Sequence, residues 1–383
     1  MASRADVLVI GGGVTGCAAA YYLARAGAGV TLVERYDLNT QASGRNAGGL
    51  HGQIQHEAWD EHGEAWAREF GPTLALMRDS IALWQGLSDE LGVDLEVSVC
   101  GGLLVAATDE QLLDVERKAA VDRAFGVEVE LLSRADLQRV APYVSKQMVG
   151  GLLCPFEGKA NPLLAAPAFA RAAAHRGARL LPQTEVHAID HTSSGFRVAT
   201  SAGPIECERV VDCGGAEAGR VSSLVGVDLP VESHPIQACV TEAVPPLVRH
   251  LMYFAGGKLT MKQARLGSLL IGGGWPARAD GDSGRLGIDL RSLGNNLRLA
   301  LEVVPGVGAA SLLRTWAGVC PGLADGKPVI GELDDVPGFF VSMFPFLGFC
   351  GGPIMGRLAA KLALGEESEH DLAPFSPSRL LSH

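Results

Sequence analysis

The 383-residue sequence lacks the features by which several functional classes are recognised. It has no run of Lys and Arg and a net charge of −11, so nucleic acid is not expected as a partner. It has no stretch of about 18 apolar residues without a charge, which argues against a membrane span. The first residues, MASRADVLVI, leave no room for a secretion signal, so we expect a cytoplasmic location.

Closely spaced cysteines are absent as well. The eight cysteines include no CxxC pair, whereas zinc and iron–sulfur sites usually take closely spaced ligands. We therefore predict no metal site in this chain. In a reducing cytoplasm, most of these cysteines are expected to be small buried side chains.

Glycine, by contrast, is plentiful, with 49 residues. Many glycines gather at the ends of predicted strands, as at Gly11–Gly13, Gly48–Gly49, Gly214–Gly215 and Gly351–Gly352. Because a glycine backbone can approach another body closely, these clusters indicate places where a ligand or a second segment comes near.

Predicted helices and strands alternate along the chain. Short buried strands at Asp6–Ile10 and Gly29–Glu34 enclose an Ala-rich helix at Thr15–Ala26, a unit typical of a parallel sheet. Residues 229–275 alternate in polarity and predict a β-rich region. Further helices are predicted at Thr73–Leu91, Glu110–Phe125, Ser133–Val140, Pro162–Arg176, Asn295–Val304 and Gly352–Leu364, and further strands at Gly101–Ala107, Arg179–Leu181, Val186–Asp190, Phe196–Thr200, Ile205–Cys213 and Phe339–Met343. The fold class is therefore α/β.

The motif GGGVTG follows the first strand and opens the first helix. Gly11 permits a tight turn, Gly13 lets the backbone approach a pyrophosphate, and Gly16 lets the helix lie close to the strand. The N-terminus of the helix would then face the phosphates. Glu34 follows about twenty residues later, where a carboxylate accepts hydrogen bonds from ribose hydroxyls. The motif predicts a dinucleotide-binding site but does not distinguish NAD from FAD.

The next segment, NTQASGRNAGGLHGQ, resembles the second flavin-contacting stretch of the D-amino acid oxidase superfamily. That superfamily includes glycine oxidase, the sarcosine oxidases, and the hydroxyproline and opine dehydrogenases. The resemblance implies that the cofactor is FAD. Ser43 and Arg45 would bind pyrophosphate oxygens, and the backbone of Gly48–Gly49 would lie against the isoalloxazine ring.

The resemblance continues to the end of the chain. Val186 lies where the family contacts adenine through its backbone, RVVDCGGAEAG resembles the strand end beneath the flavin, and RTWAGVCPGLADGKPVIGEL and FPFLGFCGGPIMGRLAAKLALG resemble the late signature and the closing glycine-rich loop. The cofactor contacts that it implies are Gly11, Gly13, Val14, Thr15, Gly16, Glu34, Arg35, Ser43, Arg45, Asn46, Ala47, Gly48, Gly49, Leu50, Val186, Cys213, Gly214, Gly215, Gly318, Gly348, Phe349, Cys350, Gly351 and Gly352.

The resemblance also implies the domain organisation, which is a Rossmann-like FAD-binding domain with a β-rich substrate domain of the glycine oxidase type. We assign residues 1–85, 143–225 and 318–383 to the discontinuous FAD-binding domain. Residues 86–142 and 226–317 are assigned to the substrate-binding domain.

Two departures from the family pattern bear on the substrate. Cys320 stands where the amino-acid oxidases place the arginine that pairs with the substrate carboxylate, and a thiol cannot replace a guanidinium. Lys262 is our candidate for the missing anchor, with a solvated strand lysine as the alternative. The closing loop also lacks the lysine that monomeric sarcosine oxidase uses to activate oxygen, which favours a dehydrogenase.

His51 directly follows the flavin-contacting loop and titrates near neutrality, so it is a candidate acceptor for a proton from a substrate ammonium. A structural histidine is the alternative. We predict His51 and Lys262 as catalytic residues, and the predicted substrate contacts are His51, Lys262, Gln263, Trp275, Trp316 and Cys320.

These features most resemble the catalytic β chain of heteromeric D-hydroxyproline, opine (octopine, nopaline) and sarcosine-oxidising enzymes. The resemblance implies oxidation of a C–N bond next to a carboxylate, with an α subunit and an iron–sulfur subunit as partners. FMN at an interface between subunits is an option that the sequence leaves open. Two alternatives are a stand-alone oxidase that produces hydrogen peroxide and a non-catalytic flavin protein that relays electrons.

Overall fold

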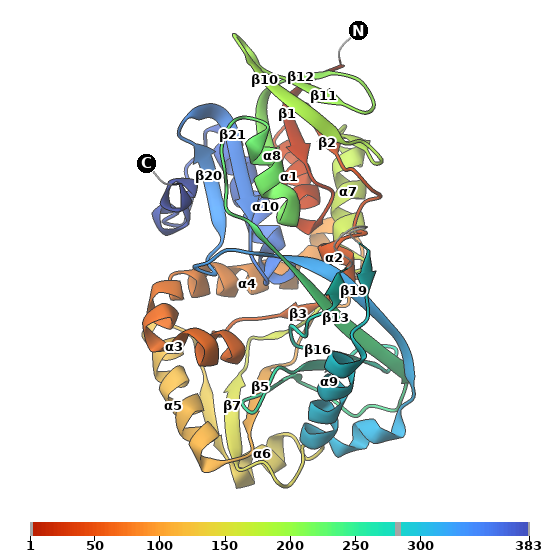
Figure 1. Ribbon diagram of the computed structural model, residues 1–383, viewed down its shortest axis with the longest axis vertical. Coiled ribbons are helices and arrows are strands. Elements are labelled where there is room, and N and C mark those ends of the chain that lie inside the picture. Colours follow the sequence, from red (N-terminus) through yellow and green to blue (C-terminus); the bar gives the residue numbers. More distant parts are fainter. Residues whose placement is uncertain (1–2, 280–284, 382–383) are drawn as a thin grey trace.

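The apolar N-terminal strand β1 (Ser3–Ile10) lies inside a sheet of the upper lobe of the computed structural model, which describes residues 3–279 and 285–381 (Figure 1). It pairs in parallel with β2 (Val30–Val33), and α1 (Val14–Arg25) connects the two strands. The predicted strand–helix–strand unit is therefore confirmed. Val7, Leu8 and Val9 are at most 1% exposed, because a central parallel strand is covered on both faces.

The first sheet has the order β10-β11-β12-β1-β2-β9, and β21 joins it by pairing with the last residues of β12 and with β20. Its strands β9, β2, β1, β12 and β21 are mutually parallel, as a Rossmann-like core requires. The remaining strands of this sheet are β9 (Arg179–Leu181), β10 (Val186–Thr192), β11 (Gly195–Thr200), β12 (Ile205–Asp212), β20 (Val329–Leu333) and β21 (Val336–Met343).

Helices rich in small residues cover this sheet. A Cβ atom on Gly356 of α10 (Gly348–Leu364) would lie 2.5 Å from the Thr15 carbonyl oxygen, so the glycine allows α10 to cross α1 closely. The other helices of the upper lobe and of its boundary are α4 (Thr73–Leu91), α7 (Ala165–His175) and α8 (Ala218–Ser223). Close helix packing fixes the N-termini of α1 and α10, which both lie at the edge of the cavity described below.

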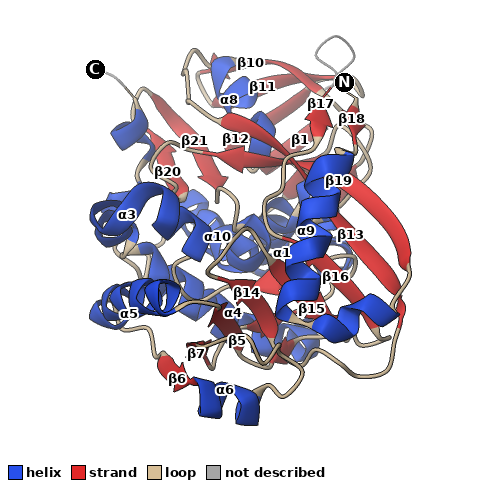
Figure 2. Ribbon diagram, turned by 60° about the horizontal axis from the view of Figure 1, so that its bottom comes forward, coloured by secondary structure: helices blue, strands red, loops and turns tan. Residues whose placement is uncertain are grey.

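The second sheet forms the lower lobe and has the order β19-β13-β16-β15-β14-β5-β7-β6 (Figures 1 and 2). Met252 and Phe254 on one face belong to the apolar cluster of α9, whereas Leu251 and Tyr253 on the other face belong to the cluster of α5. The elements of this lobe are β5 (Gly102–Ala106), β6 (Glu130–Ser133), β7 (Gly150–Cys154), β13 (Glu232–Ala243), β14 (Leu251–Phe254), β15 (Thr260–Gln263), β16 (Ser268–Gly272), β19 (Leu312–Gly322), α3 (His56–Phe70), α5 (Asp109–Ala124), α6 (Arg134–Val140) and α9 (Leu290–Val303).

Two strands of the second sheet extend beyond the residues assigned to the substrate-binding domain. β7 pairs with β5 and β6 in the second sheet, although its residues fall in the range 143–225, which was assigned to the FAD-binding domain. β19 pairs with β13 over its whole length and runs through residue 318. The division into two domains at the predicted residues stays a prediction.

All seven predicted helices are present, six of them with shifted ends. α4 has the predicted bounds, and Ser133 caps α6 by accepting from Asp136 N–H, as its sequence predicts. α9 starts at Leu290, five residues before the prediction, because Asp289 caps it. The polar helix α3 was not predicted; Gly63 interrupts it with a φ of 76°. Among the described residues, no helix is long and apolar enough to cross a membrane.

Candidate active site

A cavity of about 970 Å³ lies between the carboxyl ends of the strands of the first sheet and strand β19 of the second. Ligands of open α/β sheets bind at this edge, and the volume is close to the upper end of the roughly 300–1,000 Å³ usual for small-molecule sites. Of the predicted cofactor and substrate residues, the cavity is lined by Gly11, Gly13, Thr15, Glu34, Arg35, Ser43, Arg45, Asn46, Val186, Cys213, Gly214, Gly215, Trp316, Cys320, Gly348 and Phe349.

The glycine motif forms a cradle at the N-terminus of α1. Gly11 has a φ of +111°, and a Cβ atom there would collide with the carbonyl oxygen of Cys213. A Cβ atom on Gly13 would lie 2.9 Å from Ser43 Oγ, and α1 starts after Gly13 without a side-chain cap. The turn therefore has room for phosphate oxygens only while these positions are glycine.

The carboxylate of Glu34 is held at the edge of the same cradle. Its Oε2 accepts from Gly12 N–H at 2.7 Å and its Oε1 from Tyr36 N–H at 2.8 Å. Arg35 lies over the ring of Tyr36 and pairs with Glu217 at 3.3 Å. Glu34 keeps acceptor capacity for ribose hydroxyls, so these residues fit the adenosine end of a dinucleotide.

A short helix, α2 (Ala42–Arg45), carries the second predicted segment along the cavity. Ser43 Oγ accepts from Val14 N–H at 3.0 Å, which joins this segment to the start of α1. The Trp316 indole N–H donates to the Arg45 carbonyl oxygen at 2.6 Å, and Arg45 Nη1 donates to the Ala317 carbonyl oxygen at 3.2 Å. These bonds join the cofactor segment to β19, so the two lobes meet at α2.

The turn after α2 brings the predicted ring-contacting glycines to the two predicted catalytic residues. Asn46 Oδ1 accepts from Gly48 N–H at 2.6 Å and shapes the turn. A Cβ atom on Gly48 would lie 2.5 Å from Lys262 Nζ, and one on Gly49 would lie 2.5 Å from His51 Nε2. Residues from β15 and from the loop after β3 (Gly49–Leu50) therefore meet at this turn.

Lys262 is only 4% exposed, and its Nζ donates to the Ala160 carbonyl oxygen at 3.1 Å. Burial, together with the nearby charge of Lys159, lowers its pKa to about 7. This is not the solvated strand lysine that the sequence left as an alternative. A carboxylate beside Nζ would favour the charged ammonium.

His51 is half-buried between the turn and the second sheet. Its Nδ1 lies 2.7 Å from the Tyr253 hydroxyl, and its carbonyl oxygen accepts from the Cys350 thiol at 3.4 Å. Burial and the charge of Lys262 lower the pKa of His51 to about 4. The imidazole is therefore neutral near neutral pH.

Of the six predicted substrate contacts, Trp316 and Cys320 line the cavity. His51 and Lys262 lie beside the Gly48–Gly49 turn, outside the lining, and Gln263 and Trp275 lie elsewhere. Gln263 Oε1 accepts from Leu247 and Val248, and its Nε2 donates to the carbonyl oxygens of Val244, Pro245 and Gly267, so its amide is fully used inside the second lobe. The Trp275 indole N–H donates to the Lys258 carbonyl oxygen at 2.6 Å, and its ring packs against the apolar cluster of α9. Neither residue lines the cavity.

Cys320 and Trp316 both line the cavity, from the same strand. Burial raises the pKa of Cys320 to about 12, so the thiol stays neutral. Phe346 is beside it, 51% exposed and with a φ of 53°, which a bulky side chain seldom adopts. The place of the family arginine is thus occupied by an uncharged thiol next to an exposed aromatic ring.

The closing glycines serve the packing of α10. Cβ atoms on Gly351 and Gly352 would collide with Phe344 and Val14, and neither glycine lines the cavity. The Cys350 carbonyl oxygen accepts from Ser80 Oγ and Trp84 Nε1 of α4 at 2.6 Å and 2.8 Å. Val14, Gly16, Ala47, Gly48, Gly49, Leu50, Gly318 and Cys350 also stand outside the lining.

Several residues of the site were not found from the sequence. Thr184, Glu217 and Arg220 line the adenosine end, and Ser233 and Arg285 line the cavity from the second lobe. Glu217 lies within the segment RVVDCGGAEAG but was not singled out. The other residues gave no local signal, because strand pairing between distant segments brings them to the cavity.

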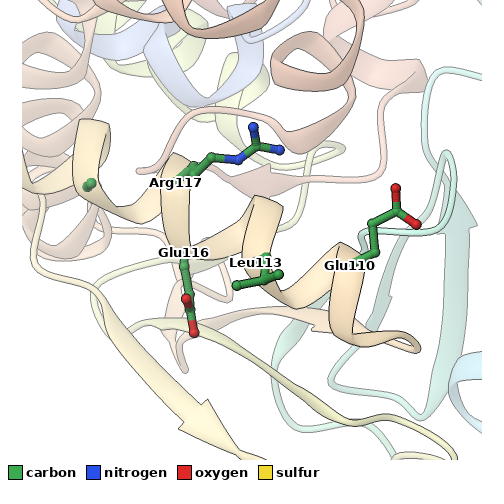
Figure 3. A pocket seen from close by; sticks show the side chains of 5 residues that line it. Glu110, Leu113, Glu116 and Arg117 are labelled. Carbon is green, nitrogen blue, oxygen red and sulfur yellow. The ribbon is translucent and has the colours of Figure 1, made fainter.

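A second depression lies on the outer side of α5 and is lined by Glu110, Leu113, Glu116, Arg117 and Ala120 (Figure 3). It consists of one surface of a single helix and includes no predicted site residue. The cavity between the two lobes is therefore the candidate active site.

The chain is similar to several known proteins. The FAD dependent oxidoreductase family model (DAO) matches residues 6–362. Glycine oxidase of Geobacillus kaustophilus (strain HTA426) is 30% identical over 99% of this chain and 98% of its own length. The crystal structure of glycine oxidase from Geobacillus kaustophilus has a TM-score of 0.87 at 29% identity and covers 100% of this chain and 99% of its own.

Two components of larger enzymes are similar as well. The beta subunit of the sarcosine oxidase of Rhizobium meliloti (strain 1021) is 28% identical over 92% of this chain and 84% of its own length. An opine oxidase subunit of Rhizobium meliloti is 27% identical over 98% of this chain and 97% of its own length. The superfamily and the fold class predicted from the sequence are confirmed. Since the family model covers nearly the whole chain, this enzyme belongs to the DAO family of FAD-dependent oxidoreductases.

Proposed function

We propose that this enzyme is a dehydrogenase that oxidises the C–N bond of a secondary or cyclic amino acid to an imine. The candidate substrates are hydroxyproline, proline, opines and sarcosine-like amines. When bound, FAD would supply N5 as the hydride acceptor for this oxidation, and the electrons would pass to a partner subunit or another acceptor. The names of the two relatives, which are subunits of a sarcosine oxidase and an opine oxidase, support both the substrate class and a heteromeric assembly.

The observation that carries the proposal is the position of Lys262. Its ammonium is buried beside Gly48, on the turn that we expect to lie against the flavin ring. A carboxylate there would gain a desolvated ion pair, which replaces the arginine pair that Cys320 cannot make. His51, neutral and beside Gly49, would accept the ammonium proton so that the amine reacts in its neutral form.

The assembly is part of the same proposal. Electrons leave this chain for an α subunit or an iron–sulfur subunit, with FMN as an optional cofactor at the interface, in a cytoplasmic complex. The absence of closely spaced cysteines is consistent with an iron–sulfur centre on a different chain.

Lys262 also favours a second candidate, an oxidase that acts alone and gives hydrogen peroxide. The sequence argued against an oxidase because the closing loop has no lysine. The second sheet, however, places the buried Lys262 beside the Gly48–Gly49 turn. A cation there would stabilise a developing oxygen anion. Glycine oxidase, at 30% identity, supports this candidate.

One pair of experiments separates these functions. The FAD-loaded chain is mixed anaerobically with proline, hydroxyproline, sarcosine, octopine and glycine, and bleaching of the flavin absorbance is followed. Bleaching by a secondary amine supports the proposal, and failure of every amine would leave only a non-catalytic electron relay. The reduced protein is then mixed with oxygen, where slow reoxidation supports a dehydrogenase and fast reoxidation the oxidase.

A further inference from the structure

The end of the cavity that fits adenosine is crossed by a chain of linked side chains. Arg35 Nη1 lies 3.3 Å from Glu217 Oε2, and the same carboxylate oxygen accepts from Arg220 Nε at 3.0 Å. Arg220 Nη1 donates to the Val186 carbonyl oxygen at 3.3 Å. The Arg35 guanidinium also lies 4.8 Å from the centre of the Tyr36 ring, within the range of a cation–π contact. All five residues line the cavity, so the chain connects two of its walls.

The sheet order places this chain over the glycine turn. β1 lies between β2 and β12, and the three parallel strands end in register. Neighbouring strands are about 4.8 Å apart, so the ends of β2 and β12 are roughly 10 Å apart. Arg35 follows β2, and Glu217 ends the short turn that follows β12. The ion pair between them, the Arg35–Glu217 bridge, therefore spans the carboxyl end of β1, where Gly11 begins the turn.

A backbone segment borders the same opening. Thr184, between β9 and β10, donates its N–H to the Glu34 carbonyl oxygen at 2.7 Å and so holds this segment against the end of β2. The next residue, Glu185, lies 3.7 Å from Arg35 Nη1, which gives Arg35 a second carboxylate within ion-pair distance. The border is fixed by backbone bonds, whereas the Arg35–Glu217 bridge consists of side chains, which can change rotamer without a change in the fold.

The bridge is weak enough to open. The side chains of Arg35 and Glu217 are 28% and 43% exposed, and ion pairs with this exposure add little to the stability of a fold. Dissolved salt screens them further. A cover made of such pairs slows the passage of a ligand by the modest factor that corresponds to breaking them, and it does not block the passage. A gate needs this property.

We propose that the Arg35–Glu217 bridge is a gate over the adenosine end of the FAD site, with Glu217 as the positioning residue that holds Arg35 across it. The bridge opens when the adenosine end is filled or emptied, and it closes over a cofactor held by the glycine turn and Glu34. This inference goes beyond the proposed function, because it concerns exchange of the cofactor. It does not depend on whether any amine is oxidised.

The first test measures how fast the holoenzyme exchanges bound FAD for an excess of radiolabelled FAD. Glu217→Gln removes the charge and keeps the size of the side chain. Because Glu217 takes part in two exposed ion pairs, we expect release to become about three- to tenfold faster. Glu208→Gln is the matched control, since Glu208 pairs with Arg4 at 3.8 Å between β12 and β1 and does not line the cavity. Its release rate should equal that of the wild type.

An unchanged release rate in Glu217→Gln would refute the gate. FAD that remains on the acid-precipitated wild-type protein would also refute it, because a covalently held cofactor has no release to control. If Glu217→Gln does not fold, Arg35→Gln removes the other partner of the bridge and gives the same comparison.

The second test separates a gate from a direct contact with adenosine. The same ion pairs must open for entry and for exit, so Glu217→Gln should speed the association of FAD with the full-length apoprotein by the same factor as its release. The Kd for FAD should then stay within about twofold of the wild-type value. A Kd that rises by the whole factor of the release rate would make Glu217 a direct contact and would overturn the gate.

Salt gives a third readout, which a loss of packing would not change. The screening length falls from about 10 Å at 0.1 M to about 3 Å at 1 M salt. In 1 M sodium chloride, release from the wild type should approach the rate of Glu217→Gln, and the rate of the variant should change less. An equal response to salt in the two proteins would contradict the role of the ion pair.

Discussion

The two ends of the cavity are built in different ways. At the adenosine end, the turn, the helix and the carboxylate come from one continuous stretch, Gly11–Glu34, and they contact one another within that stretch. At the opposite end, outside the cavity lining, Lys262 lies beside Gly48. The residues that follow this turn, His51 to Gln53, are bonded to Tyr253, Glu157 and Lys118 from separate segments. The first end depends on local backbone geometry, and the second depends on buried charges brought together by the fold.

The largest effect is expected where backbone geometry leaves no alternative. Gly11→Val adds a side chain that collides with the Cys213 carbonyl oxygen at a φ of +111°. We expect FAD to be lost almost completely, as measured by the flavin absorbance of the purified protein. Gly177→Val is the control, since Gly177 has a φ of +92° and no atom within 4 Å of its Cβ position. If Gly11→Val retained stoichiometric FAD, the cradle would not be the phosphate site.

A second large effect is expected at the buried ion pair between Lys118 and Asp122, near the opposite end of the site. Lys118→Met leaves Asp122 buried without its partner, and loss of one member of a buried pair costs about 3–5 kcal/mol. We expect the free energy of unfolding in urea to fall by that amount. Arg117→Met is the matched control, because Arg117 is 70% exposed on the outer side of the same helix and its pair with Asp114 is worth about 0–1 kcal/mol (Figure 3). Equal losses in the two variants would contradict a special role for the buried pair.

This contrast also explains what the sequence could predict. Gly11, Gly13, Gly16 and Glu34 have a fixed spacing because they belong to one strand–helix–strand unit, so a single sequence reveals them. His51 was predicted because it adjoins the Gly48–Gly49 cluster. The motif and the fold class needed no information beyond the order of the residues.

Lys118, Tyr253 and Glu157 gave no such signal. Lys118 stands in a polar helix beside the exposed Arg117, and nothing local distinguishes a buried lysine from a solvated one. Their roles depend on contacts between residues about a hundred positions apart, such as Gly52 with Glu157. Gln263 was predicted as a substrate contact because it adjoins Lys262. Its side chain points to the other face of the strand, where its amide is hydrogen-bonded to backbone groups of the second lobe.

Lys262→Met tests the substrate end for both activity and stability. Loss of the carboxylate partner should lower kcat/KM by about 10²-fold, because a desolvated charge-assisted pair is worth roughly 2–3 kcal/mol. Lys146→Met, at an exposed lysine, should leave kcat/KM unchanged. An unchanged kcat/KM in Lys262→Met would remove the anchor from the proposed function.

The same variant has a pH-dependent stability. Between about pH 7 and the ordinary lysine value of 10.5, the unfolded chain holds a proton that folded Lys262 has lost, so wild-type stability from this group rises with pH. Lys262→Met removes that cost, so it should stabilise the protein more at pH 6 than at pH 9, by a difference on the order of 2 kcal/mol. Thermal unfolding at the two pH values measures the difference, and a larger gain at pH 9 would show that the lysine is not buried as a cation at low pH.

The smallest effect is expected at Cys320, and it bears directly on the contrast between the two ends. If the missing arginine is replaced by Lys262 and not by the thiol, Cys320→Ala removes only a neutral group whose sulfur lies 3.9 Å from the Phe346 carbonyl oxygen. We expect kcat/KM for the amine to change by less than about threefold, the equivalent of well under 1 kcal/mol. A loss as large as that in Lys262→Met would show that the thiol itself contacts the reacting substrate. The substrate end would then rely on two segments of the second sheet, β15 and β19, to hold one ligand.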